Sequence, residues 1–163
     1  MDHNSLSKHQ FTEWGKYLSK KDDLKFIDIK LEHMYGKDDD ENKFIPWIIK
    51  NFRENKPYIN LTLGEQKRDF IYIDDVVSAF MTILDNISSN DFNDFEIGVG
   101  KTVAIKDLIE NLKSRFNADT KLNFGALPYR EYETMESKAN IENLKKLGWM
   151  PKINLQSGLA RLI

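Results

Sequence analysis

The stretch RDFIYIDDVVSAF, residues 68–80, decides the class of the fold, because in it a strand pattern passes directly into a helix pattern. Its first half, DFIYI, is a short apolar run rich in aromatic and β-branched residues, which favours a buried strand. From Asp75 to about Asn86 the spacing predicts a helix, with Asp74 placed to cap it. A strand followed at once by an amphipathic helix is typical of an α/β protein.

Strand and helix patterns alternate outward from this stretch in both directions. In residues 25–35, for example, Ile27, Ile29 and Leu31 alternate with polar residues, which is the period of a strand. Further strands are expected over 58–62, 95–99 and 121–124. Further helices are expected over 5–20, 44–52, 104–116 and 140–148, with a last turn or two from Leu155. The sequence therefore predicts an α/β fold.

Three of the expected helices carry apolar residues at helical spacing, which predicts a buried stripe on each. These stripes are Phe11, Trp14 and Leu18 in the first helix, Phe44, Ile45, Ile48, Ile49 and Phe52 in the second, and Val76, Val77, Phe80, Met81 and Leu84 in the third. Gly15 interrupts the first helix at a cost of about 1 kcal/mol relative to alanine, so packing must hold it in place. Thr102 is placed to cap the fourth helix.

Composition excludes several classes of function. The 24 basic and 26 acidic residues are spread along the 163-residue chain, so no one-signed face is expected for nucleic acid or an anionic membrane. The chain has no cysteine, and His3, His9 and His33 lack partners at metal-binding spacing, so we expect no metal site. No apolar run approaches the ~20 residues of a membrane span or forms a signal peptide. We therefore expect a cytoplasmic protein whose partner is a small ligand.

Several motifs occur in order along nearly the whole chain. They are SLSK at 5–8, FIDIKLEHMYG at 26–36, GEQKRDFIYIDDVVSAF at 64–80, FEIGVGKTVAIKDL at 95–108, LPYRE at 127–131 and LGWMPKINLQSGL at 147–159. Together they resemble the C-terminal, substrate-binding half of an extended short-chain dehydrogenase/reductase. This family comprises NAD(P)-dependent epimerases, dehydratases and reductases of nucleotide sugars.

The resemblance implies the C-terminal portion of a Rossmann-type epimerase/dehydratase fold, lacking most of the parallel sheet. We expect a single compact unit over 1–163. Residues 1–36 would supply the last Rossmann helix and strand. Residues 37–163 would form a mixed α/β substrate-binding lobe, from which one strand, at about 94–99, returns to the sheet.

Lys8 matches the family lysine that lowers the pKa of a catalytic tyrosine and bonds the cofactor ribose. The tyrosine position is occupied by Asn4, and an amide cannot exchange a proton with a sugar hydroxyl during hydride transfer. Full-length members bind NAD or NADP through a glycine-rich turn that this chain lacks. The resemblance therefore implies that the chain alone binds no cofactor and is inactive, and Lys8 is alternatively an exposed helix lysine.

Arg68 and Arg130 match two family arginines that contact the nucleotide diphosphate. Two guanidinium groups converging on a diphosphate give bidentate, charge-assisted bonds. The alternative is a pair of surface ion pairs, with Arg68 reaching Glu65 or Asp69 and Arg130 reaching Glu131 or Glu133.

Other family positions carry further candidates. Asn42, Lys43 and Phe44 match a helix start that packs on the base and sugar, although Phe44 is alternatively a core residue. Glu133 matches an acidic position near the ribose. His33 stands where the family often has an asparagine beside the diphosphate.

Two hypotheses follow for the function. The first is the nucleotide-sugar-binding part of an epimerase, dehydratase or reductase, closest to members that act on deoxysugar nucleotides of bacterial surface polysaccharides. The second is a non-catalytic binding or self-assembly module. It would pair through the sheet edge left open beside residues 25–35, because unpaired strand edges recruit partners. The expected partners are accordingly a nucleotide sugar, a second copy of the chain, or a separate N-terminal Rossmann half.

Overall fold

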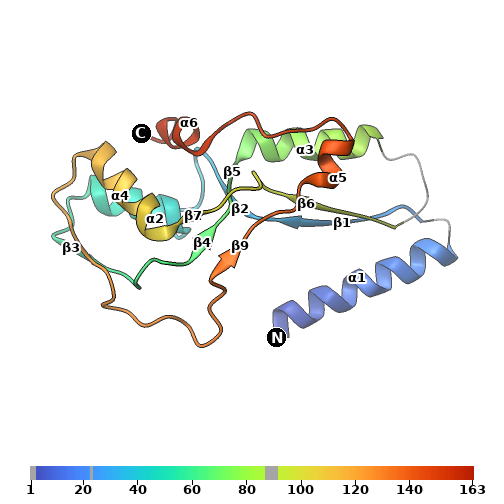
Figure 1. Ribbon diagram of the computed structural model, residues 1–163, viewed down its shortest axis with the longest axis horizontal. Helices are drawn as coiled ribbons and strands as arrows, with labels where there is room; N and C mark the ends of the chain where they lie inside the picture. The colour runs from blue at the N-terminus through green and yellow to red at the C-terminus, as the bar shows by residue number, and fades with distance from the viewer. Residues whose placement is uncertain (1–2, 23, 87–91) are drawn as a thin grey trace.

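The computed structural model describes residues 3–22, 24–86 and 92–163 and confirms the α/β class. A parallel pair of strands, β1 (Phe26–Leu31) and β6 (Phe92–Ile97), lies between α1 (His3–Lys21) on one face and α3 (Ile73–Asn86) on the other (Figure 1). The remaining helices are α2 (Phe44–Arg53), α4 (Ile105–Phe116), α5 (Glu142–Lys146) and α6 (Leu155–Ala160). The remaining strands are β2 (His33–Tyr35), β3 (Tyr58–Asn60), β4 (Lys67–Arg68), β5 (Phe70–Tyr72), β7 (Val103–Ala104), β8 (Lys121–Asn123) and β9 (Glu136–Ser137).

Within residues 3–22, 24–86 and 92–163, the strands form four small sheets. β1 pairs with β6, β2 with β5 and β3 with β8, all in parallel, while β4 lies between antiparallel β7 and parallel β9. The strand predicted over 25–35 is two strands, because the backbone changes neighbour at its middle. Glu32 N donates to the carbonyl of Ile97 at the end of β6, and His33 N donates to the carbonyl of Asp69 just before β5. Within the described part of the chain, the other edge of β1 pairs with no strand.

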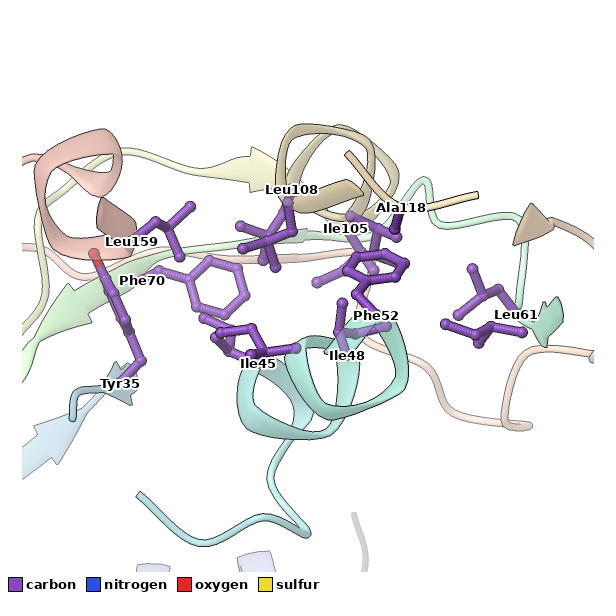
Figure 2. Close-up of a cluster of buried hydrophobic side chains, with 14 of the residues drawn as sticks. Tyr35, Ile45, Ile48, Phe52, Leu61, Phe70, Ile105, Leu108, Ala118 and Leu159 are labelled. Carbon is purple, nitrogen blue, oxygen red and sulfur yellow. The ribbon is translucent and has the colours of Figure 1, made fainter. Parts of the chain in front are cut away.

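Two apolar cores organise the molecule. The larger core lies in a lobe around α2 and α4, where the predicted α2 stripe is confirmed: Ile45, Ile48, Ile49 and Phe52 are buried (Figure 2). The second core joins α3, β6 and α5 through Ile71, Ala79, Ile83, Phe95, Ile97, Leu144 and Trp149. The lobe is therefore packed internally, and a separate core holds α3 to the parallel pair.

A buried carboxylate connects the two cores. Asp69, between β4 and β5, is fully buried and accepts N–H donors from Val99 and Gly100 at 2.8 Å and from Ala139 at 3.3 Å. Three backbone donors stabilise an ionised carboxylate that would otherwise be costly to bury. Gly98 is required here, because a Cβ at this position would lie 2.6 Å from an Asp69 oxygen. The turn after β6 is thus fixed against the strand that carries Arg68.

The predicted stripes of α1 and α3 are not buried as expected. Phe11 and Trp14 of α1 are 68% and 63% exposed, and Leu18 is partly buried. α1 packs on β1 through its small residues and through the ring of Phe11, whose centroid lies 5.7 Å from that of Phe26. Gly15 lies against the ring of Phe26, and Thr12 donates to Asp28 at 3.1 Å. On α3, Val76 is buried, whereas four other members of the stripe are exposed: Val77, Phe80, Met81 and Leu84.

Two predicted helix caps are also wrong. α3 already begins at Ile73, so Asp74 lies inside its first turn and pairs with Arg161. The residue before α4 is Ala104, and Thr102 donates its hydroxyl hydrogen to Glu136 at 3.0 Å. In both cases a tertiary partner uses the side chain that the sequence pattern assigned to the helix end.

Candidate functional site

A cavity of about 540 Å³ opens in the lobe between α2, the β3–β4 connection and residues 124–133. Its apolar wall consists of Phe44, Trp47, Leu61, Phe70, Ile105, Ile109, Phe124, Leu127 and Pro128. Its polar lining consists of His33, Asn60, Thr62, Gln66, Arg68, Arg130 and Glu133. Volume and lining are typical of a small-ligand site, in which apolar surface carries a few convergent polar groups.

Arg68 is the charged group set deepest in this cavity. It belongs to β4, and its residue is only 9% exposed. Its guanidinium donates to the carbonyl of Lys67 at 2.9 Å and to a carboxylate oxygen of Glu133 at 2.5 Å. The expected alternative partners, Glu65 and Asp69, are not the ones that the structure shows for it. β4 thus fixes the guanidinium group of Arg68 beside the apolar wall of the cavity.

Arg130 approaches the same cavity from the loop that follows β8. Its backbone carbonyl accepts the N–H of Glu133 at 3.1 Å in a turn, and its side chain is exposed. In the described part of the chain, the ion pair of Glu133 is with Arg68, and Arg130 has none. The fold therefore brings both predicted arginines to one cavity, one buried and paired and one open to solvent.

His33 lines the cavity beside Phe70. The two rings meet at a centroid distance of 5.6 Å and an angle of 62°, and His33 Nδ1 lies 3.4 Å from a carboxylate oxygen of Glu32. Both oxygens of Glu32 accept the hydroxyl of Ser137, at 2.8 and 2.9 Å. This arrangement places an imidazole edge in the same cavity as the two arginines.

Of the three candidates at the start of α2, which are Asn42, Lys43 and Phe44, only one lines the cavity. Phe44 lines the cavity, while Asn42 and Lys43 are not among its lining residues. Asn42 donates from both its backbone N–H and its amide to Asp40 at 2.9 Å, which lowers the pKa of that carboxyl. Lys43 pairs with Asp39 at 2.7 Å. Asp39 and Asp40 of the acidic loop thus bind the side chains of Lys43 and Asn42, which the family resemblance assigns to the ligand.

Lys8 lies on the exposed surface of α1 and is not among the lining residues of the cavity. Asn4 belongs to the same helix, and its side chain lies outside the described part of the structure. A dinucleotide cradle would need free amides at a glycine turn after a strand. In the turn after β6, the amides of Val99 and Gly100 donate to Asp69 instead. These residues do not fit NAD, so no hydride-transfer step is assigned to them.

The sequence did not indicate several residues that line the cavity. Trp47 lies on α2 outside the predicted stripe, and Phe124 and Leu127 reach the cavity only because β8 pairs with β3. Gln66 also lines it, and its amide oxygen is buried without a hydrogen-bond partner among the described residues. Gln66 and Leu127 lie within quoted motifs, but the motifs assign them no role, and the placement of all four residues depends on contacts between distant segments.

Fold and cavity together define an α/β protein of the Rossmann-related class with a cavity in its own lobe. The sequence profile of the "NAD dependent epimerase/dehydratase family" matches residues 5–98. The chain belongs to this family, and the resemblance inferred from its motifs is confirmed.

Curated relatives are similar over almost the whole chain. CDP-abequose synthase of Salmonella muenchen is 40% identical over 158 residues, which are 96% of this chain and 54% of that protein. A dTDP-4-dehydro-6-deoxyglucose reductase of Escherichia coli is 29% identical over 167 residues, 97% of this chain and 50% of that protein. The chain therefore spans about half the length of the curated relatives it matches.

Solved structures support the fold. UDP-glucose 4-epimerase of Thermotoga maritima, determined with UDP-glucose, has a TM-score of 0.84 at 23% identity and matches over 96% of this chain and 50% of its own. The dTDP-glucose 4,6-dehydratase of Bacillus anthracis, determined with NAD, has a TM-score of 0.84 at 21% identity, over 99% and 50%. The Rossmann-type epimerase/dehydratase architecture is thus shown for the matched half.

The described residues contain neither a membrane-spanning helix nor a cluster of metal-binding side chains. None of the helices there is long and apolar enough to cross a membrane. No group of three or more His, Asp or Glu side chains lies close enough together in these ranges to hold a metal ion.

Proposed function

We propose that this chain is the nucleotide-sugar-binding part of an NAD(P)-dependent enzyme that acts on deoxysugar nucleotides, with a cytidine diphosphate sugar as the first candidate ligand. The observation that carries the proposal is that Arg68 and Arg130 line one cavity together with a wall of apolar and aromatic side chains. The 40% identity to a protein named CDP-abequose synthase supports the choice of nucleotide. Turnover would require the cofactor-binding half of the fold, which these residues do not form.

The chemistry of the cavity divides into two parts that match the two parts of such a ligand. Arg68 and Arg130 offer guanidinium donors to a diphosphate, and a fork geometry suits phosphate oxygens. Phe44, Trp47 and Phe124 offer apolar and aromatic surface to a base. His33 and Glu133 extend the polar end toward hydroxyl groups and the diphosphate. We assign substrate binding to these residues and keep Asn42 and Lys43 as less direct candidates.

Isothermal titration calorimetry with CDP-glucose, UDP-glucose and dTDP-glucose tests the proposal. We expect CDP-glucose to bind, and Arg68→Ala and Arg130→Ala each to weaken binding at least about tenfold, because a charge-assisted bond is worth about 1.5–3 kcal/mol. Arg161→Ala is the matched control, since it removes an arginine that pairs with Asp74 outside the cavity.

Arg68 is buried and paired, so its replacement by alanine also leaves Glu133 without a partner. Arg68→Lys therefore accompanies it, because lysine keeps the charge but loses the fork. Thermal unfolding of each variant separates lost binding from lost folding. Equal affinities in the wild type and in both arginine-to-alanine variants, with all three folded, would refute the proposal.

A second candidate function, a binding or self-assembly module, is favoured by the open edge of β1 and the exposed side of α1 beside it. A shallow, largely apolar depression of about 590 Å³ lies along α1 between His9, Gln10, Glu13, Trp14 and Tyr17. Such a face suits a second copy of the chain or a separate polypeptide that carries a Rossmann half. Light scattering at micromolar concentration tests it: a dimer that Trp14→Glu dissociates supports the module, and a monomer contradicts it.

A further inference from the structure

The carboxylate of Glu133 forms an ion pair with the guanidinium of Arg68, the group that we assign to the diphosphate. Glu133 lies 2.5 Å from Arg68 Nη2, and both side chains are largely shielded, at 19% and 11% exposure. Both residues also line the cavity. The buried arginine of the site is therefore neutralised by an acidic side chain of the protein itself.

Two anions cannot use the same guanidinium edge without repelling each other. A diphosphate that enters the cavity must either displace Glu133 from Arg68 or bind beside its negative charge, and both are unfavourable. Displacement becomes acceptable only if the carboxylate finds new donors, because a shielded charge without a partner is strongly destabilising. Bare di- and triphosphates carry more negative charge than the esterified diphosphate of a nucleotide sugar and have no sugar hydroxyls, whereas the hydroxyl groups of ribose and hexose can donate to the carboxylate.

We propose that Glu133 is a specificity-determining residue. It excludes bare di- and triphosphates from the cavity and admits ligands whose sugar hydroxyls take over its carboxylate. This inference rests on the proposed function, because it assigns the diphosphate to Arg68. It adds a selection rule that the arginines alone do not provide, since two arginines would attract any polyphosphate.

The surroundings of Glu133 fit such an exchange. Its backbone N–H is held in the turn at Arg130, so the side chain can leave Arg68 while its backbone stays in place. The same loop is tied to the lobe by Tyr129, whose hydroxyl accepts the N–H of Glu65 at 3.1 Å. Arg130 is exposed and lies at the cavity, so a second guanidinium is available while Arg68 is still paired.

The test compares the affinities of inorganic pyrophosphate and CDP-glucose, measured by calorimetry on the wild-type chain and on Glu133→Gln. Glutamine removes the competing charge and keeps the shape, so we expect pyrophosphate to bind about tenfold more tightly. CDP-glucose should gain nothing, because it loses the carboxylate that accepts its hydroxyls. Glu131→Gln makes the same charge change two residues away, outside the cavity lining, and should alter either affinity less than about twofold because solvent screens it.

The outcomes separate this inference from the proposed function. Unchanged pyrophosphate affinity in Glu133→Gln overturns the inference, and so does an equal gain for both ligands, which would show only a general charge effect. If Arg68→Ala leaves CDP-glucose affinity unchanged, the proposed function itself fails. Should Glu133→Gln not fold, Glu133→Asp serves instead, because it keeps the charge and withdraws the carboxylate by one methylene. We then expect a smaller gain for pyrophosphate alone, and no gain overturns the inference.

Discussion

Helices α2 and α1 both carry apolar residues at helical spacing, yet those of α2 are buried and the aromatic residues of α1 are exposed. On α2 the four residues Ile45, Ile48, Ile49 and Phe52 are at most 5% exposed and form the centre of the lobe. On α1 the aromatic residues Phe11, Trp14 and Tyr17 are at least 54% exposed. The lobe thus covers its own apolar surface, whereas on the sheet side the aromatic residues of α1 are exposed.

This difference shows which helix gains folding stability from burial of its apolar side chains within the chain. Burial of the α2 stripe removes apolar area from water within one chain, which is the main favourable contribution to folding. The α1 aromatics gain nothing comparable until another surface covers them. Substitutions on the two helices should therefore separate effects on stability from effects on association.

The largest expected effect is in the lobe. Ile48→Ala removes a fully buried side chain from the core and should lower the free energy of unfolding by about 2–5 kcal/mol. Trp14→Ala is the counterpart on α1 and should change it by less than about 1 kcal/mol, despite the larger side chain removed. Urea unfolding of both variants measures the contrast. Similar losses for the two would mean that α1 is buried in the isolated chain, and would break the comparison.

The junction between the two regions comes next. Asp69→Asn keeps the shape of the side chain but turns an amide group toward backbone N–H donors of Val99, Gly100 and Ala139. A buried donor left without an acceptor costs about 1–3 kcal/mol, so we expect a total loss near 3 kcal/mol. Hydrogen exchange of the Val99 and Gly100 amides should accelerate with it. Unchanged protection of these amides would show that Asp69 does not hold the two regions together.

A smaller effect tests how α1 sits on the sheet. On a free helix Gly15→Ala would gain about 1 kcal/mol. Here the new methyl group would overlap the ring of Phe26, so we expect a net loss of about 1–2 kcal/mol. The double variant Gly15→Ala with Phe26→Ala removes the overlap, and the alanine should then cost nothing further. If Gly15→Ala stabilises the chain by itself, α1 does not pack on β1 through its small residues.

The same two helices show how far the sequence could predict the fold. Periodicity located α1, α2 and α3 to within a few residues, and on α2 it also identified the buried face. On α1 it identified the buried face only in part, because Phe11 contacts Phe26 and Leu18 is partly buried, but Trp14 is exposed and the buried positions are Gly15 and Ser19. Apolar spacing locates an apolar face on a helix. It does not show whether another segment of the same chain buries that face.

The candidate site divides in a similar manner. The family resemblance named His33, Phe44, Arg68, Arg130 and Glu133, and the fold brings all five to one cavity, whereas Asn42 and Lys43, named in the same way, do not line it. What no motif could supply is which partners these side chains choose, since the contact of Arg68 with Glu133 joins residues 65 positions apart. The pairing of β3 with β8, which brings Phe124 to the cavity, is equally non-local.

The smallest expected effect concerns the surface charges next to the two helices. Hydrogen bonds from Asn42 lower the pKa of Asp40 before α2, and the hydrogen bond and charge of Lys16 lower the pKa of Glu13 on α1. A carboxyl group whose pKa is lowered by folding stabilises the protein above its unfolded pKa, and this contribution disappears as pH falls through the folded pKa.

Asn42→Ala should therefore raise the pKa of Asp40 toward its ordinary value and leave that of Glu13 unchanged, because each carboxyl depends on a partner a few residues away. Carboxyl carbon chemical shifts followed from pH 2 to pH 7 by NMR measure both groups in one sample, which makes Glu13 an internal control. An unchanged Asp40 would show that the amide of Asn42 is not engaged there. The amide would then be free to turn toward the cavity, as the family resemblance implies, and Asn42 would belong to the candidate site and not to the acidic loop.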